Sequence, residues 1–147
     1  MSVRLATAAD VPAILAMAEA FVRESDYGME FDQERAAAYL ALLVDHPEAA
    51  IFFDDENPGA VIVTVQHAWC KRPECYVEKL FLMPAARGSG VARTLVVAAV
   101  EFARQHNCSH IFATATAGMG ETVGQLYANL FRKFDFTGCG PVLVRSL

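Results

Sequence analysis

The stretch LFLMPAARGSGVARTLVVAAVEFA, residues 80–103, decides the fold. An apolar run ends at Pro84, a basic turn with two glycines follows from Arg87, and an apolar pattern resumes at Val91. An apolar run that is bounded by turn residues and followed by helical periodicity is typical of a strand that leads into a helix. We therefore predict a strand, a glycine turn and a helix over residues 91–105.

The glycine turn has the chemistry of an anion site. A strand that feeds such a turn and then a helix points several backbone N–H groups at one spot, where the helix dipole also favours negative charge. Gly88 and Gly90 allow close approach of the backbone and a positive φ, and Arg87 and Arg93 add charge-assisted donors. The alternative is a structural turn in which Ser89 caps the helix and the glycines only relieve strain.

Periodicity and turn residues predict the elements on either side of this turn. We expect a first strand over residues 3–6, a helix entered through a cap at Asp10 with Pro12 in its first turn, and a helix over 32–44. Strands over 49–53, 60–69 and 76–83 would form an antiparallel meander. A strand over 110–116, a helix over 121–134 and a strand over 141–145 follow the 91–105 helix. The expected apolar stripes are Val91, Leu95, Ala98 and Phe102 in one helix and Val123, Leu126, Leu130 and Phe134 in the other.

Composition places the chain among compact globular proteins. Its 147 residues, 54% hydrophobic and 20% charged, fit a single domain over 1–147 that folds alone or as an oligomer, a homodimer included. A net charge of -5 with no lysine cluster argues against a nucleic-acid partner. The chain shows neither a signal-peptide pattern nor an apolar run near the roughly 20 residues of a membrane span, so we expect a cytoplasmic location away from the membrane.

Four cysteines raise the question of disulfides and of a metal. Free thiols are the expectation in a reducing compartment for Cys70, Cys75, Cys108 and Cys139. Cys70 and Cys75 flank a short turn and would face each other across a hairpin, with His67 nearby. Because this set lacks a C-x2-C spacing and a fourth ligand, we expect no metal site.

Three stretches resemble the GNAT N-acetyltransferase superfamily. Residues 76–95, YVEKLFLMPAARGSGVARTL, resemble its acetyl-CoA-binding segment, which has a strand, a proline and then [RQ]-x-x-G-x-[GA] opening a helix. Residues 3–10, VRLATAAD, look like its first strand and helix entry, and residues 130–136, LFRKFDF, are similar to its closing L-Y-x-K-x-G-F. The resemblance covers the whole chain. It implies an α+β fold, with a central twisted mixed β-sheet flanked by about four helices and splayed between its fourth and fifth strands.

The resemblance also implies how acetyl-CoA would be held. The pantetheine arm would pair with the backbone of Leu80, Phe81 and Leu82 like an added strand. Phe131 stands where the family has a tyrosine and is expected beside the cofactor. The pyrophosphate would be held by the turn residues Arg87, Gly88, Ser89, Gly90, Val91, Ala92 and Arg93.

Acetyl transfer to an amine needs a base and gains from an acid. An alkyl amine of pKa near 10.4 is about 3 units from neutrality at pH 7, or roughly 4 to 5 kcal/mol. Glu78 is the candidate base, and the alternative is a surface glutamate paired with a cation. A departing thiolate, with a pKa near 8.5, needs only roughly 2 kcal/mol of help. Phe131 cannot donate a proton, so Tyr127, one helical turn earlier, is the candidate acid, and the alternative is packing.

The function implied is an acetyl-CoA-dependent N-acetyltransferase that acts by direct attack in a ternary complex on an amine of a small molecule or protein. A different class is a catalytically degenerate member that binds acyl-CoA or a partner, which Phe131 suggests, as do Gly120 and Gly124 where the family has an asparagine. The acceptor would lie between the first two helices. An acidic and aromatic lining there favours a cationic or amphipathic amine, with a solvated loop as the alternative. This lining comprises Glu24, Asp26, Glu30, Asp32, Phe21, Tyr27 and Phe31.

Overall fold

The protein forms one mixed sheet of five strands. The computed structural model describes residues 3–25, 28–114 and 120–138, and the strand order is β1-β2-β3-β4-β5. The first four strands form an antiparallel meander, and the fifth runs parallel to β4. The predicted meander and the mixed sheet are therefore confirmed. The strands are β1 (Arg4–Leu5), β2 (Ala49–Asp54), β3 (Gly59–Gln66), β4 (Glu74–Leu82) and β5 (His110–Ala113).

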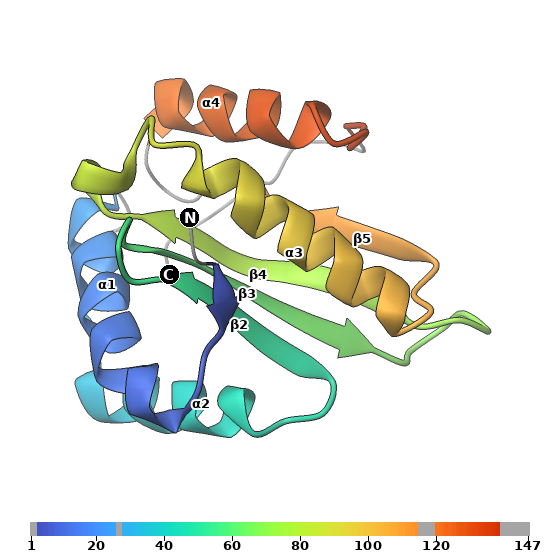
Figure 1. Cartoon of the computed structure of the whole chain (residues 1–147), viewed down its shortest axis with the longest axis horizontal. Coiled ribbons are helices and arrows are strands. Elements are labelled where there is room, and N and C mark those ends of the chain that lie inside the picture. The colour runs from blue at the N-terminus through green and yellow to red at the C-terminus, as the bar shows by residue number, and fades with distance from the viewer. Residues whose placement is uncertain (1–2, 26–27, 115–119, 139–147) are drawn as a thin grey trace.

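Helices cover both faces of the sheet (Figure 1). Side chains of α1 and α2 pack in one apolar cluster, whereas those of α3 and α4 pack in another on the opposite face. The helices are α1 (Val11–Glu24), α2 (Gln33–Val44), α3 (Val91–Gln105) and α4 (Gly120–Arg132), with short 3-10 turns η1 (Ala8–Asp10) and η2 (Pro84–Ala86).

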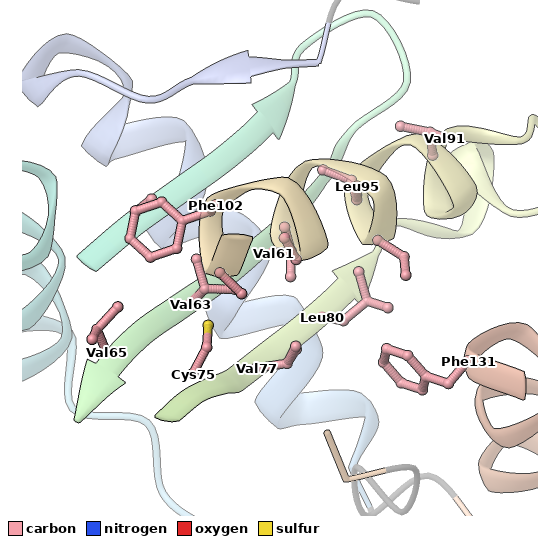
Figure 2. Close-up of a cluster of buried hydrophobic side chains, with 14 of the residues drawn as sticks. Val61, Val63, Val65, Cys75, Val77, Leu80, Val91, Leu95, Phe102 and Phe131 are labelled. Atoms are coloured by element: carbon pink, nitrogen blue, oxygen red, sulfur yellow. The ribbon is translucent and has the colours of Figure 1, made fainter. Parts of the chain in front are cut away.

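The alternation of side chains along β3 supplies both cores. Val61 and Val63 point toward α3, and Ala60 and Ile62 point toward α1 and α2. Figure 2 shows Leu95 of α3 above this strand. Because both faces are covered, almost every residue of β3 is buried. Hydrophobic burial on both sides thus fixes the position of the central strands.

The hairpin between β3 and β4 is longer than the sequence predicts. Trp69, which was expected in a strand, lies in the connection and is 94% exposed. The predicted pairing of Cys70 with Cys75 is wrong, because Cys75 lies opposite Val65 and is buried, whereas Cys70 is exposed in the loop. Burial raises the pKa of the Cys75 thiol to about 12. The register of the strands therefore buries Cys75 in the apolar core and leaves Cys70 in the loop, although the two cysteines flank the same turn in the sequence.

The entry to α1 also differs from the prediction. Asp10 precedes the helix, but its carboxylate makes no cap hydrogen bond to α1. Instead it accepts two hydrogen bonds of 2.8 Å from the Arg4 guanidinium and one of 2.8 Å from the Thr7 amide. These charge-assisted bonds lower the pKa of Asp10 well below its usual range. The acid thus ties β1 to the turn before the helix.

The buried face of α4 is rotated from the predicted stripe. Leu126 is 64% exposed, whereas Phe131 is buried and Tyr127 packs against the α3-side cluster. Leu130 and Phe134 also pack there, as expected. The face of α4 that packs against the cluster therefore carries the aromatic side chains of Tyr127 and Phe131.

The strand expected over 141–145 and Cys139 lie outside the described residues. Within the described ranges, no helix combines the length and the apolar character that crossing a membrane requires.

A matched pair of leucine substitutions tests the placement of the core. Leu95 is a residue of α3 and is fully buried, whereas Leu126 of α4 is largely exposed. Leu95→Ala removes buried methyl groups and leaves a cavity, so we expect the free energy of unfolding to fall by about 2 to 5 kcal/mol. Leu126→Ala should change it by less than about 0.5 kcal/mol. Urea denaturation followed by far-ultraviolet circular dichroism measures both, and equal losses would contradict the described packing.

Candidate active site

The sheet opens between β4 and β5. The two strands pair from Glu74 with His110 to Val77 with Ala113. Beyond Val77, β4 continues for five residues to Leu82, and these have no ladder partner on the β5 side among the described residues. At about 3.3 Å per residue, the free edge is roughly 16 Å long. Within the described residues, this edge therefore has no strand beside it at Leu80 to Leu82, where we predicted that an extended ligand pairs.

A β-bulge places Glu78 where the strands part. Ile62 and Val63 of β3 are consecutive but lie opposite Lys79 and Val77, so Glu78 is the additional residue of β4. Bulges disturb the alternation of side chains and redirect them locally. Glu78 thus follows directly after the last residue of β4 that pairs with β5.

The described surroundings of Glu78 give its carboxylate a hydroxyl partner and no counter-charge. The Thr64 hydroxyl donates a hydrogen bond of 2.6 Å to Glu78 Oε1. The ion pairs of the described residues do not include Glu78, so its alternative role as one half of a surface pair is not seen there. Burial, and then the negative charge of Glu78, raise the pKa of Tyr39 on α2. The half-buried Glu78 therefore lies beside Thr64 and close enough to Tyr39 for its charge to act on that side chain.

Contacts with the β2–β3 turn hold the far end of the open edge. The Met83 amide donates a hydrogen bond of 2.9 Å to the Pro58 carbonyl. A Cβ atom on Gly59 would lie only 2.7 Å from Leu82 Cδ2, so a larger residue there would displace the end of the Leu82 side chain. The same turn is closed by buried Asp54, whose Oδ1 accepts hydrogen bonds from the amides of Glu56 and Asn57.

The glycine turn, for which we predicted a cradle of amides, lies between η2 and α3. Gly88 and Gly90 have φ values of 85° and 89°, in the left-handed region that glycine tolerates. Val91 anchors the first turn of α3, because its side chain is fully buried. Among the described residues, the amides of Gly88, Gly90 and Ala92 have no hydrogen-bond acceptor. The turn therefore presents unpaired N–H groups at the start of a helix of 15 residues, as an anion site does.

The polar side chains of the cradle differ in whether they already have a partner within the protein. The Ser89 hydroxyl donates a hydrogen bond of 2.7 Å to the Ala86 carbonyl, which also accepts the Ser89 amide at 3.2 Å. Arg87 Nη2 lies 2.6 Å from Glu24 Oε2. Arg93 is exposed, and its guanidinium has no ion-pair partner in the described ranges. Arg93 is thus the unpaired cation of the turn.

The structure separates the two aromatic candidates on α4. Phe131 is buried in the α3-side cluster, where Figure 2 shows it beside Leu80, and its ring centroid lies 5.1 Å from that of Phe136. Burial raises the pKa of Tyr127, while the charge of Arg87 lowers it and that of Glu24 raises it. Tyr127 therefore lies near the cradle, and Phe131 packs on the open strand.

Part of the expected acceptor lining has structural roles. Asp32 caps α2 by accepting a hydrogen bond of 2.9 Å from the Arg35 amide. The Phe21 ring packs on Phe81 of β4 at 5.6 Å between centroids. Asp26 and Tyr27 lie outside the described residues. Glu30 is exposed and Phe31 is half-buried, so both remain candidates to meet an acceptor.

The sequence reasoning missed Thr64 as the partner of Glu78 and Arg87 as the partner of Glu24. Thr64 bonds to Glu78 across neighbouring strands, and the bulge shifts that register, so period-two alternation alone did not bring the two together. Glu24 was recognised as an acid near the acceptor, but its partner Arg87 is distant in sequence. The described residues also contain no group of three or more metal-ligating side chains that could hold an ion.

Comparison with solved structures supports this fold over the full length of the chain. A protein of Agrobacterium tumefaciens, whose role as an acetyltransferase is itself inferred, superposes with a TM-score of 0.76 at 20% identity, covering 99% of this chain and 100% of that one. AAC(6')-Iy, in complex with the bisubstrate analogue CoA-S-monomethyl-acetylneamine, gives 0.75 at 14% identity, covering 99% and 97%. The aminoglycoside antibiotic 6'-N-acetyltransferase AAC(6')-IG of Acinetobacter haemolyticus gives 0.73 at 17% identity, covering 100% and 98%.

Sequence comparison gives a family but no individual relative. No curated protein matches the chain. The model of the acetyltransferase (GNAT) family, in contrast, matches residues 14–130. This range includes β4, the glycine turn, α3 and β5. The chain belongs to the acetyltransferase (GNAT) family.

Proposed function

We propose that the protein is an N-acetyltransferase that transfers the acetyl group of acetyl-CoA to an amine of a small molecule or of a protein. The observation that carries this proposal is the open edge of β4, which begins at Glu78 and leads to the cradle of unpaired amides. One strand thus connects a candidate base with a candidate phosphate site.

The residues present fit acetyl-CoA in two ways. The free backbone edge at Leu80, Phe81 and Leu82 suits a pantetheine arm that pairs as an added strand. The unpaired amides of Gly88, Gly90 and Ala92 suit the oxygens of a diphosphate, with Arg93 as a further cation. Bound there, acetyl-CoA would supply the thioester carbonyl that the amine attacks.

Glu78 is proposed as the base that makes the acceptor amine nucleophilic. Its carboxylate takes a proton from the ammonium form, directly or through water, while Thr64 holds the carboxylate in place. The amine nitrogen then bonds to the carbonyl carbon as the carbon–sulfur bond breaks, and the nitrogen releases its second proton to water. The departing thiolate takes a proton, for which Tyr127 is the proposed donor, and Tyr127 is reprotonated from water. A tyrosine is protonated at neutral pH, and the raised pKa of Tyr127 keeps it so.

Direct attack fits the chemistry of the thiol on β4. An acyl-enzyme route through Cys75 would need the thiolate form of this side chain. Cys75 is buried on the strand, and burial raises its pKa to about 12, so it stays a neutral thiol. A ternary complex of protein, acetyl-CoA and amine is therefore the proposed route.

The structural neighbours support the two substrates of the proposal. AAC(6')-Iy was solved with a bisubstrate analogue that contains CoA, and an aminoglycoside acetyltransferase from a soil metagenome was solved with sisomicin. Both neighbours share less than 25% identity with this chain, so they support the reaction class and leave the acceptor open.

Phe131 favours a second candidate function. It occupies the position of the family's tyrosine, carries no hydroxyl, and is only 5% exposed in an apolar cluster. A protein of this fold that binds acyl-CoA or a partner without turnover would tolerate such a residue. The two candidates differ in thiol release.

A binding and turnover assay separates the two candidates. We expect isothermal titration calorimetry to show acetyl-CoA binding, because the cradle and the open edge are preformed. A panel of cationic and amphipathic amines should then release free thiol in at least one case. Binding without any thiol release supports the second candidate, and no binding contradicts the proposed transferase and an acyl-CoA-binding role alike.

Gly90→Val tests the cradle. A β-branched side chain is strained at a positive φ and would crowd the amides, so we expect acetyl-CoA binding to be lost in calorimetry. Asn107→Val is the matched control, because Asn107 also has a positive φ, of 54°, but follows the opposite end of α3. Comparable strain should lower the melting temperature of both variants, and only Gly90→Val should lose binding. Retained binding in Gly90→Val would show that the ligand does not use this turn.

Glu78→Gln tests the base. Glutamine keeps an oxygen for the Thr64 hydroxyl but cannot take a proton, so acetyl-CoA affinity should stay unchanged and kcat should fall by about 10²-fold or more. Glu101→Gln, on the exposed surface of α3, makes the same charge change and should leave kcat unchanged. Full activity of Glu78→Gln at neutral pH would remove Glu78 from the mechanism.

A further inference from the structure

The one ion pair of the described residues that involves the cradle joins Arg87 to α1. Arg87 Nη2 lies 2.6 Å from Glu24 Oε2, and the two side chains are 43% and 41% exposed. This is a charge-assisted hydrogen bond at short distance. It raises the pKa of Arg87, with Glu24 as the largest cause.

The sheet positions Glu24 for this contact. Glu24 is the last residue of α1, and α1 is held against β4 through the contact between Phe21 and Phe81. Arg87 follows η2 directly, immediately before the two glycines of the cradle. The end of α1 therefore presents a carboxylate to a phosphate-binding turn.

A carboxylate and a phosphate compete for the same donors on a guanidinium. Both are oxyanions that accept from the planar fork of N–H groups. While Nη2 of Arg87 donates to Glu24, it is not available to a second anion in that direction. The carboxylate also sets a negative charge beside the place where a diphosphate would enter, and like charges repel.

From this geometry we infer that Glu24 is a built-in competitor for the diphosphate of coenzyme A, which must displace the Glu24 carboxylate from Arg87 to bind. The inference rests on the proposed function, since it takes the cradle as the site for this ligand. Glu24 thereby becomes a determinant of cofactor affinity that makes no contact with the cofactor itself.

The expected size of the effect follows from the exposure of the pair. Ion pairs between partly exposed side chains contribute little, and the diphosphate also gains the unpaired amides of Gly88, Gly90 and Ala92. The diphosphate can therefore displace the Glu24 carboxylate readily, and we expect this competition to raise the Kd for coenzyme A by about two- to fivefold. Salt should reduce the difference, because it screens exposed charges.

The test is calorimetric titration of the full chain with coenzyme A. We expect Glu24→Gln to bind about two- to fivefold more tightly than the wild type. Glu19→Gln is the matched control, because Glu19 lies on the same helix in an equally short pair with Arg23 and carries the same charge. It should bind like the wild type. Pantetheine, which lacks the diphosphate, should bind Glu24→Gln and wild type equally.

A double-mutant cycle shows whether the effect passes through Arg87. Arg87→Gln alone should weaken coenzyme A binding, and adding Glu24→Gln to it should bring a clearly smaller gain than in the wild type, because only the charge repulsion remains to be removed. An equal gain in both backgrounds would mean that Glu24 acts only as a nearby charge, and would overturn the inference. Unchanged or weaker binding in Glu24→Gln would overturn it too, since the pair would then only tether α1. Thermal unfolding of each variant identifies losses due to misfolding.

The outcomes for the two proposals remain distinguishable. If the wild type binds coenzyme A and Glu24→Gln binds no better, the competitor role fails and the proposed function stands. If neither the wild type nor any variant binds coenzyme A, both fail together.

Discussion

Backbone pairing between β4 and β5 stops at Val77 and Ala113, and the arrangement of the site depends on this interruption. A parallel neighbour along the whole of β4 would satisfy its backbone groups and close the sheet. Because the pairing stops, residues 78–82 have no partner strand on the β5 side within the described ranges, and Glu78 lies at the beginning of this segment. The bulge against β3 and the end of the β4–β5 ladder thus coincide at Glu78.

The glycine turn is held at the other end of that edge by apolar packing. Leu80 and Leu82 lie against the same cluster as Val91 and Leu95, so strand and helix are both anchored while the turn between them remains exposed. In the part of the chain that the structure describes, the turn amides of Gly88, Gly90 and Ala92 have no acceptor, while the residues on either side of the turn are anchored by burial.

Sequence patterns predicted those elements whose conformation depends mainly on neighbouring residues in the chain. The meander, the α3 helix and the glycine turn followed from periodicity, Pro84 and the paired glycines. The face of α4 and the partner of Arg87 did not follow, because they depend on which side chains meet across the fold. Leu126 fits a helical stripe as well as Tyr127 does, and only the shape of the sheet beneath selects between them. The bulge at Glu78 likewise arises from register and leaves no mark in the residue types.

The hairpin between β3 and β4 has a practical consequence for spectroscopy. Trp69 is the only tryptophan of the chain and stands 94% exposed in this connection. Its indole is already surrounded by water in the native state, so its emission should have a red-shifted maximum and change little when the chain unfolds. Trp69 is also a local reporter, since a ligand or protein that binds to this hairpin would shift or quench its fluorescence, and no other indole contributes to that emission.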